Sequence, residues 1–330
     1  MKRKSTAIVA ALAAVALGAA ACGSDSDSGG TTAGGAKDGN YKLAFVQGVA
    51  GDAFYITMEC GIKEEAAKEG ATVTTQGAQK FDPTLQTPIL QSVIASKPDA
   101  ILIAPTDVSA MQQPIAQAKA QGIKIVLVDT TLNDPSVAVS AISSDNTAGG
   151  KAAFEAIQKL APNGGKVLGV GVQPGISTTD ARDKGFADAA KADSKFTYLG
   201  VQYSQNDPAK AASIVSAALQ KDPDIVGIFA SNLFSAQGSA TGIRQAGKQG
   251  QVNVVGFDAG PEQIKALQDG TVQALIAQQP GDIGVQGVQQ AIKALKGESN
   301  EANIQTGSTI ITKDTIDSAE GKAAAYKASC

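Results

Sequence analysis

DPTLQTPILQSVIASKPDAILIAPTDVSAMQQPIAQAKAQGIKIVLVD, residues 82–129, contains the pattern that decides the fold. Asp82-Pro83 predicts a helix start, because the carboxylate caps free N–H groups and Pro suits the first helical position. Pro98-Asp99 ends that helix and opens an apolar strand that finishes at Ala104. After a second helix, another strand ends in Val128-Asp129. This order predicts strands and helices in alternation, as in a parallel sheet.

The same plan occurs a second time further along the chain. Asp207-Pro208 is followed by Pro223-Asp224, a strand ending at Ala230, a helix, and a strand ending in Phe257-Asp258. In both copies 15 residues separate the two prolines. Chance matching of Asp-Pro pairs is the alternative, but equal spacing and the same downstream order favour two similar lobes.

Short β-branched runs and Ala-rich amphipathic runs alternate over the rest of the chain. The predicted strands are Lys42–Gln47, Thr72–Thr75, Ala100–Ile103, Lys124–Val128, Lys166–Val172, Thr197–Gln202, Ile225–Phe229, Asn253–Gly256 and Val272–Ile276. Predicted helices include Ile56–Lys68, Thr84–Ser96, Ser109–Gln121, Gly149–Leu160, Ala209–Gln220, Ser235–Ala246 and Ile283–Leu295. The fold class is therefore α/β, with parallel sheets covered by helices. Ligands of such sheets bind beyond the carboxyl ends of the strands, so two facing sheets would share one cleft.

The N-terminus has the features of an export signal. A basic start (Lys2 to Lys4) precedes an uncharged run of small residues from Ala7 to Ala21, which is shorter than the roughly 20 residues of a spanning helix. Ala19-Ala20-Ala21-Cys22 resembles the lipobox of bacterial lipoproteins, although Ala19 stands where Leu is usual. We therefore expect a signal peptide over 1–21, and an acylated Cys22 with a flexible Gly/Ser-rich tether over 22–39. Plain secretion is the alternative.

Composition excludes several classes of function. The chain of 330 residues has no His, which removes imidazole-based catalysis and His-ligated zinc, and its three Cys are too scattered for a thiolate metal site. Any metal would therefore have to be held by oxygen ligands, and we expect no metal and no cofactor. Without the signal, 25 Lys and Arg stand against 31 Asp and Glu, so the chain carries a net negative charge. This charge argues against binding to nucleic acid, whose phosphates require a positively charged surface.

A series of motifs in fixed order carries a family resemblance. The motifs are Asp52-Ala-Phe54-Tyr55, Ile-Ala-Pro-Thr-Asp107, Val128-Asp129, Ser144-Asp145-Asn146, Asp180-Ala-Arg182-Asp-Lys-Gly185-Phe, Asn232, Val255-Gly-Phe257-Asp258 and Ile276-Ala-Gln278-Gln-Pro280. In their order and spacing, residues 42–312 resemble the ribose/galactose-type sugar-binding proteins of ABC importers. Their two-lobed Venus-flytrap fold (type I periplasmic binding protein) also forms the core of LacI-type repressors. A repressor would carry a helix-turn-helix where this chain has its signal and tether.

The resemblance implies two three-layer α/β/α lobes joined by three hinge strands. The N-terminal lobe would comprise 40–143 with 278–307, the C-terminal lobe 144–277 with about 308–315, and 316–330 would be a tail. Hinge rotation would close the lobes on the ligand. The implied protein is a monomer, held by lipid at the outer face of the cytoplasmic membrane, that delivers its ligand to the permease of an ABC transporter.

The resemblance also implies a site for a neutral sugar or polyol, whose vicinal hydroxyls suit carboxylates and amides and whose C–H face suits aromatic rings. The implied ligand-binding residues are Asp52, Phe54, Tyr55, Asp129, Ser144, Arg182, Asn232, Phe257, Asp258 and Gln278. Each has a simpler structural alternative: core packing for Phe257, a cap or turn for Asp129 and Asp258, and a surface ion pair with Asp180 or Asp183 for Arg182.

Two departures from the family pattern bear on which sugar is bound. Ala104 stands where ribose binders have Asn, and Thr130 stands where they have Arg. The loss of two polar groups argues against ribose and favours another pentose, a hexose, an inositol or a linear polyol. Three acidic groups against one Arg argue against an anionic ligand and leave a cationic one open.

The remaining alternatives concern the cysteines and the activity. An exported location permits a disulfide between Cys60 and Cys330, which would fix the tail to the first lobe; the alternative is a buried Cys60 and a free tail.

We expect no enzymatic activity. A receptor for a membrane signalling partner, and a secreted glycan hydrolase using a pair such as Asp52 and Asp258, are the competing functions.

Overall fold

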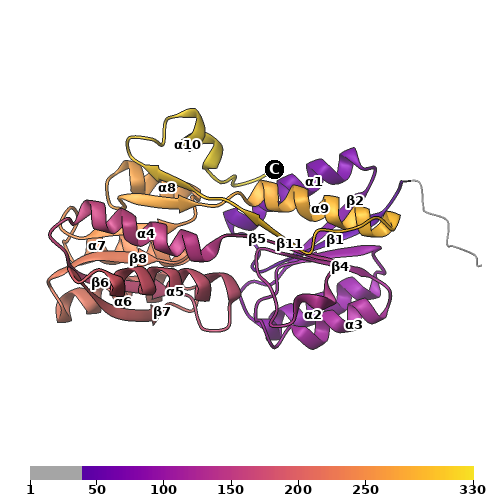
Figure 1. Cartoon of the computed structure of the whole chain (residues 1–330), viewed down its shortest axis with the longest axis horizontal. Coiled ribbons are helices and arrows are strands. Elements are labelled where there is room, and N and C mark those ends of the chain that lie inside the picture. Colours follow the sequence, from indigo (N-terminus) through magenta and orange to yellow (C-terminus); the bar gives the residue numbers. More distant parts are fainter. Residues whose placement is uncertain (1–38) are drawn as a thin grey trace, which may run out of the picture. The chain divides into compact units, whose positions relative to one another are not determined.

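The computed structural model describes residues 39–330. The expected signal peptide, the lipidated Cys22 and nearly all of the tether lie outside the described residues. Residues 39–330 form two six-stranded sheets, each with helices on both faces (Figure 1). The α/β class and the two similar lobes are thereby confirmed. None of the helices in this range is long and apolar enough to cross a membrane.

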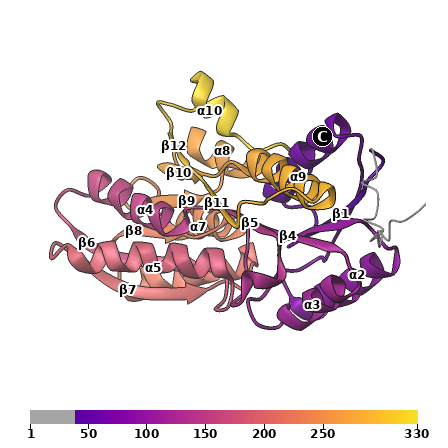
Figure 2. The same ribbon diagram turned by 45° about the vertical axis from the view of Figure 1, so that its right-hand side comes forward.

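The N-terminal lobe is built on a sheet of parallel strands in the order β11-β5-β4-β3-β1-β2. Its elements are β1 (Lys42–Gln47), α1 (Ala53–Lys68), β2 (Thr72–Gly77), α2 (Pro83–Ala95), β3 (Ala100–Ile103), α3 (Gln112–Ala120), β4 (Lys124–Val128), η1 (Pro135–Val137), β5 (Ser140–Ser144), α9 (Pro280–Lys296) and β11 (Asn303–Thr306). Helices α1 and α9 cover one face of this sheet, and α2 and α3 cover the other (Figure 2).

The C-terminal lobe has the strand order β12-β10-β9-β8-β6-β7, in which only β12 runs antiparallel to its neighbour. Its elements are α4 (Asn146–Leu160), β6 (Gly165–Gly171), α5 (Ser177–Ala192), β7 (Phe196–Tyr203), α6 (Pro208–Lys221), β8 (Ile225–Ala230), α7 (Leu233–Gln245), β9 (Asn253–Phe257), α8 (Pro261–Gln268), β10 (Ala274–Ala277), β12 (Thr309–Thr312) and α10 (Ala319–Ala324). Helices α4 and α5 pack on one face, and α6, α7 and α8 pack on the other.

The repeated Asp-Pro pairs begin equivalent helices, as the sequence predicts. Asp82 accepts a hydrogen bond from Thr84 N at 2.7 Å at the start of α2, and Asp207 accepts one from Ala209 N at 2.7 Å at the start of α6. In each helix the proline occupies the first turn, where no backbone donor is needed. Local chemistry alone thus fixes both helix starts.

Three short strands were not among the predicted ones: β5, β11 and β12. They share a location, because they lie where the chain passes between the two sheets. The chain leaves the first sheet after β5, returns to it after β10 and leaves it again between β11 and β12. A strand of four or five residues beside such a crossing is too short for its period of two to stand out from a loop.

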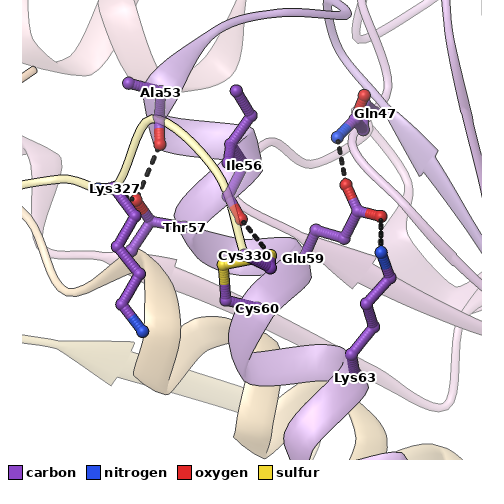
Figure 3. Close-up of a disulfide and its surroundings, with 9 residues drawn as sticks. All are labelled: Gln47, Ala53, Ile56, Thr57, Glu59, Cys60, Lys63, Lys327 and Cys330. Carbon is purple, nitrogen blue, oxygen red and sulfur yellow. Dashed lines mark hydrogen bonds and ion pairs between the residues drawn. A yellow bond between two sulfur atoms is a disulfide. The ribbon is translucent and has the colours of Figure 1, made fainter.

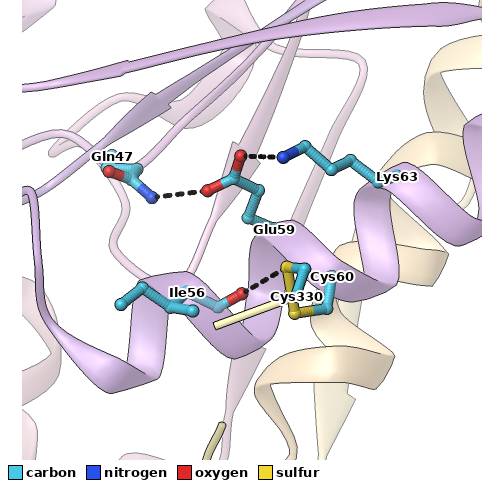
Figure 4. A network of polar contacts seen from close by, with 6 residues as sticks. All are labelled: Gln47, Ile56, Glu59, Cys60, Lys63 and Cys330. Atoms are coloured by element: carbon cyan, nitrogen blue, oxygen red, sulfur yellow. Dashed lines mark hydrogen bonds and ion pairs between the residues drawn. A yellow bond between two sulfur atoms is a disulfide. The ribbon is translucent and has the colours of Figure 1, made fainter. Parts of the chain in front are cut away.

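The C-terminal segment ends on the opposite lobe from its last strand. After β12 and α10 it reaches helix α1, where Cys330 forms a disulfide with Cys60 (Figure 3). Beside the disulfide, Glu59 accepts from Lys63 Nζ at 2.6 Å and from Gln47 Nε2 at 3.4 Å, so α1 is also tied to the end of β1 (Figure 4). The last residues therefore connect the C-terminal lobe to the N-terminal lobe covalently.

Candidate functional site

Asp129 and Asp258 lie at equivalent places in the two lobes. Each follows a central strand, β4 or β9, with a positive φ of 64° and 77° respectively. Each also donates its backbone N–H to the neighbouring strand, Asp129 to Ile142 O at 2.8 Å and Asp258 to Ile276 O at 2.9 Å. Asp tolerates this left-handed conformation better than most residues, and the turn aims each carboxylate away from the sheet edge.

A pocket of about 410 Å³, including its opening to solvent, lies between the carboxyl ends of the two sheets. Residues of both lobes line it: Asp52, Phe54, Tyr55, Phe81, Asp129, Val172, Ile176, Thr178, Thr179, Arg182, Asn206, Asn232, Asp258 and Gln278. Eight of the ten predicted site residues are therefore brought together, and the exceptions are Ser144 and Phe257.

The two lobes touch each other across the mouth of this pocket. Val108 N donates to Gly175 O at 3.0 Å, and Thr131 N donates to Ser177 Oγ at 2.9 Å. Gln173 Nε2 lies 3.5 Å from Phe81 O. These contacts join loops of opposite lobes, so the structure is a closed form in which the two lobes meet beside the pocket.

The acidic side chains are held in place by neighbouring donors. Asp52 caps α1 and accepts from Phe54 N at 2.9 Å. Asp129 Oδ2 accepts from the Tyr55 hydroxyl at 2.7 Å. Asp258 is more heavily engaged: Oδ1 accepts from Gln278 Nε2 at 2.7 Å, and Oδ2 accepts from a backbone amide of α7 at 3.0 Å. The carboxylates are thus oriented before any ligand arrives.

Arg182 is a buried side chain with its own partners. Its Nε donates to Asn146 Oδ1 at 2.7 Å, one terminal nitrogen donates to Ser231 O at 3.0 Å, and its Cζ lies 3.8 Å from the centroid of the Phe257 ring. The guanidinium stacking adds to these hydrogen bonds. The alternative of a surface ion pair with Asp180 or Asp183 is wrong, because Arg182 is only 3% exposed and forms no such pair within the described chain.

The two predicted residues outside the wall act behind it. Phe257 supports the guanidinium of Arg182, and Ser144 Oγ donates to Gln278 Oε1 at 2.8 Å. Ser144 closes β5 and Gln278 follows β10, so this bond lies where the chain passes between lobes. Neither side chain lines the pocket. Phe257 instead orients Arg182, and Ser144 orients Gln278.

Burial sets the protonation of the acidic groups. It raises the pKa of Asp52 to about 7, with the charge of Asp258 adding to the effect. It raises the pKa of Asp129 to about 6, against the opposing influence of Arg182 and of the Tyr55 hydroxyl. The pKa of Tyr55 is raised well above its usual value by burial and by Asp129, so its phenol remains a donor. The site is therefore poor in water and rich in acceptors.

Several lining residues were missed by sequence reasoning: Phe81, Val172, Ile176, Thr178, Thr179 and Asn206. The Thr179 hydroxyl is buried without a hydrogen-bond partner in the described part of the chain, which makes it available to a ligand. Phe81 lies next to the Asp82 helix cap, so proximity to a predicted helix start could have flagged it. Thr178 and Thr179 carry no comparable signal, because Thr in the first turn of a helix is common.

The two departures from the ribose pattern do not reach the pocket. Ala104 is fully buried, and the Thr130 hydroxyl donates to Pro105 O at 2.8 Å. Neither residue lines the cavity. Although three carboxylates surround the pocket, residues 39–330 contain no group of three or more acidic or Cys side chains arranged to hold a metal ion.

Comparisons with known proteins agree with this architecture. The family model described as a periplasmic binding protein domain matches residues 43–299. The ribose import binding protein of Escherichia coli (strain K12) is 33% identical over 271 residues, which cover 82% of this chain and 90% of that protein. The D-allose-binding periplasmic protein of the same organism is 30% identical over 253 residues, covering 74% of this chain and 81% of that protein.

Solved structures extend the similarity to sugar complexes. An ABC transporter solute-binding protein from Agrobacterium vitis, bound to α-D-tagatopyranose, is 40% identical with a TM-score of 0.86, covering 87% of this chain and all of that one. Another from the same organism, with bound D-fucose, is 30% identical with a TM-score of 0.82, covering 86% and 100%. With the two-lobed fold and the shared cleft, these matches show that the chain belongs to the sugar-binding periplasmic binding protein family.

Proposed function

We propose that this protein captures a neutral monosaccharide or polyol in the pocket between its lobes and delivers it to the permease of an ABC transporter. One observation carries the proposal: three buried carboxylates from two lobes converge with Arg182 and Gln278 on one small pocket. Relatives of the same fold are complexed with α-D-tagatopyranose and D-fucose.

The donor and acceptor set fits a polyhydroxylated ligand. Carboxylates at Asp52, Asp129 and Asp258 accept from hydroxyls, while Arg182 and Gln278 donate to hydroxyl or ring oxygens. Phe54 and Phe81 in the same wall offer rings to the apolar C–H face of a sugar. A ligand with several adjacent hydroxyls and one apolar face would satisfy both kinds of wall.

Charge argues for a neutral ligand. Three carboxylates against one guanidinium would repel an anion in a dry site, where Coulomb forces are strong. Burial raises the pKa values of Asp52 and Asp129, which supports a ligand that brings hydrogen-bond donors to these carboxylates. Sugar hydroxyls supply such donors without adding charge. Ribose stays among the candidate ligands, because neither Ala104 nor Thr130 lines the pocket.

The proposal includes a lipid anchor at the N-terminus. Acylation of Cys22 and a tether over 22–39 would hold the sugar-binding unit near its permease at the outer face of the cytoplasmic membrane. Cys22→Ala should then move the protein from the membrane fraction to the soluble fraction of the producing cell. Wild-type protein that incorporates no labelled fatty acid, as Cys22→Ala should not, would rule out the lipid anchor.

A thermal-shift screen tests the ligand class. The panel contains D-tagatose, D-fucose, D-arabinose, D-allose, D-ribose, inositols, linear polyols and amino acids. A ligand at a hundred times its Kd stabilises by about 2.7 kcal/mol, which raises Tm by several degrees. A shift with one carbohydrate supports the proposal, and a shift only with amino acids overturns it. NMR of the recovered ligand should find it intact, since a cleaved glycan would indicate a hydrolase instead.

A further inference from the structure

The C-terminal segment 313–330, which we call the strap, joins the two lobes outside the sheets. It starts after β12 in the C-terminal lobe, where Tyr326 N donates to Ala259 O at 3.0 Å. One residue later it is on the N-terminal lobe, because Lys327 N donates to Thr57 Oγ1 at 2.8 Å (Figure 3). The disulfide to Cys60 then closes the connection. The strap lies beyond residues 43–299, the part matched by the family model.

Tyr326 reaches from the strap to the base of the pocket. It is buried, with its hydroxyl donating to Asp258 Oδ1 at 3.0 Å and accepting from Gln278 N at 2.9 Å. Its ring lies 5.9 Å from that of Phe54. Asp258, Gln278 and Phe54 all line the pocket, whereas Tyr326 does not. The phenol therefore touches three wall residues from behind.

The arrangement repeats a pairing in the other lobe. There, the Tyr55 hydroxyl donates to Asp129 Oδ2 at 2.7 Å, so each of the equivalent Asp residues is held by one phenol. Tyr55 belongs to α1, the first helix of the fold, and Tyr326 belongs to the strap, which is bonded to that same helix. Phe54 packs between the two phenol rings, at 5.2 Å from Tyr55.

We propose that Tyr326 is a positioning residue for the sugar site, held at the base of the pocket by the disulfide-bonded strap. This rests on the proposed function, since it assigns a further residue to the same site. The hydroxyl fixes one oxygen of Asp258 and one backbone amide at the crossing between lobes. Without it, the carboxylate and Gln278 would have to be ordered by the incoming ligand, which weakens binding.

A double-mutant cycle tests whether Tyr326 acts through Asp258. Tyr326→Phe keeps the ring and removes the hydroxyl, and Asp258→Gly removes the carboxylate while suiting the positive φ. Affinities for D-tagatose, D-fucose, D-arabinose, D-allose and D-ribose are measured by calorimetry on oxidised protein. We expect Tyr326→Phe to weaken the tightest of these about 10-fold in wild type and less than about 2-fold in Asp258→Gly.

Two controls separate positioning from general destabilisation. Tyr326→Phe combined with Asp129→Gly should show additive effects, because Tyr326 does not touch Asp129. Tyr41→Phe removes a buried hydroxyl that has no partner in the described residues, so its Kd should equal that of wild type. Equal losses from Tyr326→Phe in the wild-type and Asp258→Gly backgrounds would overturn the proposal.

The role of the disulfide is tested with Cys60→Ser/Cys330→Ser. This variant, and wild type in dithiothreitol, should both bind the same sugar several-fold more weakly, and dithiothreitol should not change the variant further. Wild-type affinity that does not respond to reduction would show that the disulfide does not hold Tyr326 in place.

A measurement without sugar makes the outcome independent of the ligand. The backbone N–H of Gln278 donates to the Tyr326 hydroxyl. Hydrogen exchange of this backbone amide should therefore accelerate at least about 10-fold in Tyr326→Phe and stay unchanged in Tyr41→Phe. Unchanged exchange in Tyr326→Phe overturns the proposal whatever the sugar data show. If no carbohydrate binds but exchange responds, the positioning role stands and the assigned ligand class fails.

Discussion

Gly150 lies directly against the backbone of Arg182: a Cβ at Gly150 would stand 2.0 Å from the Arg182 carbonyl oxygen. Gly185 faces Thr147 O in the same way, at 2.2 Å, so α4 and α5 cross in direct backbone contact. This crossing fixes where α5 presents its arginine to the pocket. The position of Arg182 in the pocket wall therefore depends on the absence of a side chain at Gly150 in the neighbouring helix.

We predict that Gly150→Ala destabilises the protein by about 1–3 kcal/mol, because the helices must separate. It should also weaken sugar binding, since Arg182 moves with α5. Chemical denaturation and calorimetry measure the two effects. Gly281→Ala is the matched control, because a Cβ at that helical position meets nothing within 4 Å. Equal behaviour of the two variants would contradict the crossing as described.

Charge removal at the strand ends should reduce affinity without unfolding the lobes. Asp129→Asn and Asp258→Asn keep the shape of the side chain and tolerate a positive φ. Each should weaken sugar binding about 10- to 100-fold, because a hydrogen bond to a charged acceptor becomes neutral. Asp224→Asn is the control, since Asp224 lies just before the amino end of β8 in an exposed ion pair with Lys166. Unchanged Kd values in both site variants would remove these residues from the site.

Stability of the ligand-free protein should depend on Asp52 between about pH 4 and pH 7. Its pKa is raised from 3.8 to about 7 on folding, so in this window the folded state binds more protons than the unfolded state. The free energy of unfolding therefore falls as pH rises, by up to about 1.4 kcal/mol per pH unit for this group. Asp52→Asn keeps the helix cap, and its stability relative to wild type should increase from pH 4 to pH 7. A pH-independent difference in urea unfolding would contradict the raised pKa.

Sugar affinity should rise between pH 5 and pH 8. Hydroxyls that donate to Asp52 and Asp129 favour the ionised carboxylates, whose pKa values in the free protein are about 7 and about 6. Binding near pH 6 should thus release protons, which calorimetry detects as a dependence on the buffer's ionisation enthalpy. Proton uptake at this pH would mean that the ligand accepts from neutral acids.

The disulfide should add to thermal stability. It connects residues 270 positions apart. In chain-entropy models, a disulfide that closes so long a loop stabilises the folded state by roughly 2–4 kcal/mol or slightly more. Reduction should lower Tm by several degrees in wild type and leave Cys60→Ser/Cys330→Ser unchanged. Alkylation under non-reducing, denaturing conditions should leave both cysteines unmodified, and modification of either thiol would contradict the bridge.

The repeat made much of this site predictable. Asp129 and Asp258 follow equivalent strands in two copies of one local plan, so their joint arrival at one cleft follows from topology. The helix starts at Asp82 and Asp207 were equally accessible, because a cap depends on neighbours two or three residues away.

Tyr326 and Thr179 were not predictable on the same grounds. Tyr326 belongs to a segment with no counterpart in the repeat, and its partner Asp258 is 68 residues away. The environment of Thr179 depends on how the lobes meet, which no local pattern encodes. Phe257 shows the opposite failure: its motif lies beside the pocket residue Asp258, but its own ring faces the guanidinium of Arg182 and does not line the pocket.

The Cys60–Cys330 bond also determines how the molecule carries tension. A pull between residue 40 and Cys330 passes along β1 and the start of α1, then crosses the disulfide. The 269 residues between the two cysteines stay outside the loaded path, and the stretched segment extends to roughly 70–75 Å at most. Reduction would place the whole of both lobes in series with the force. In the oxidised protein the C-terminal lobe is therefore shielded from the applied force.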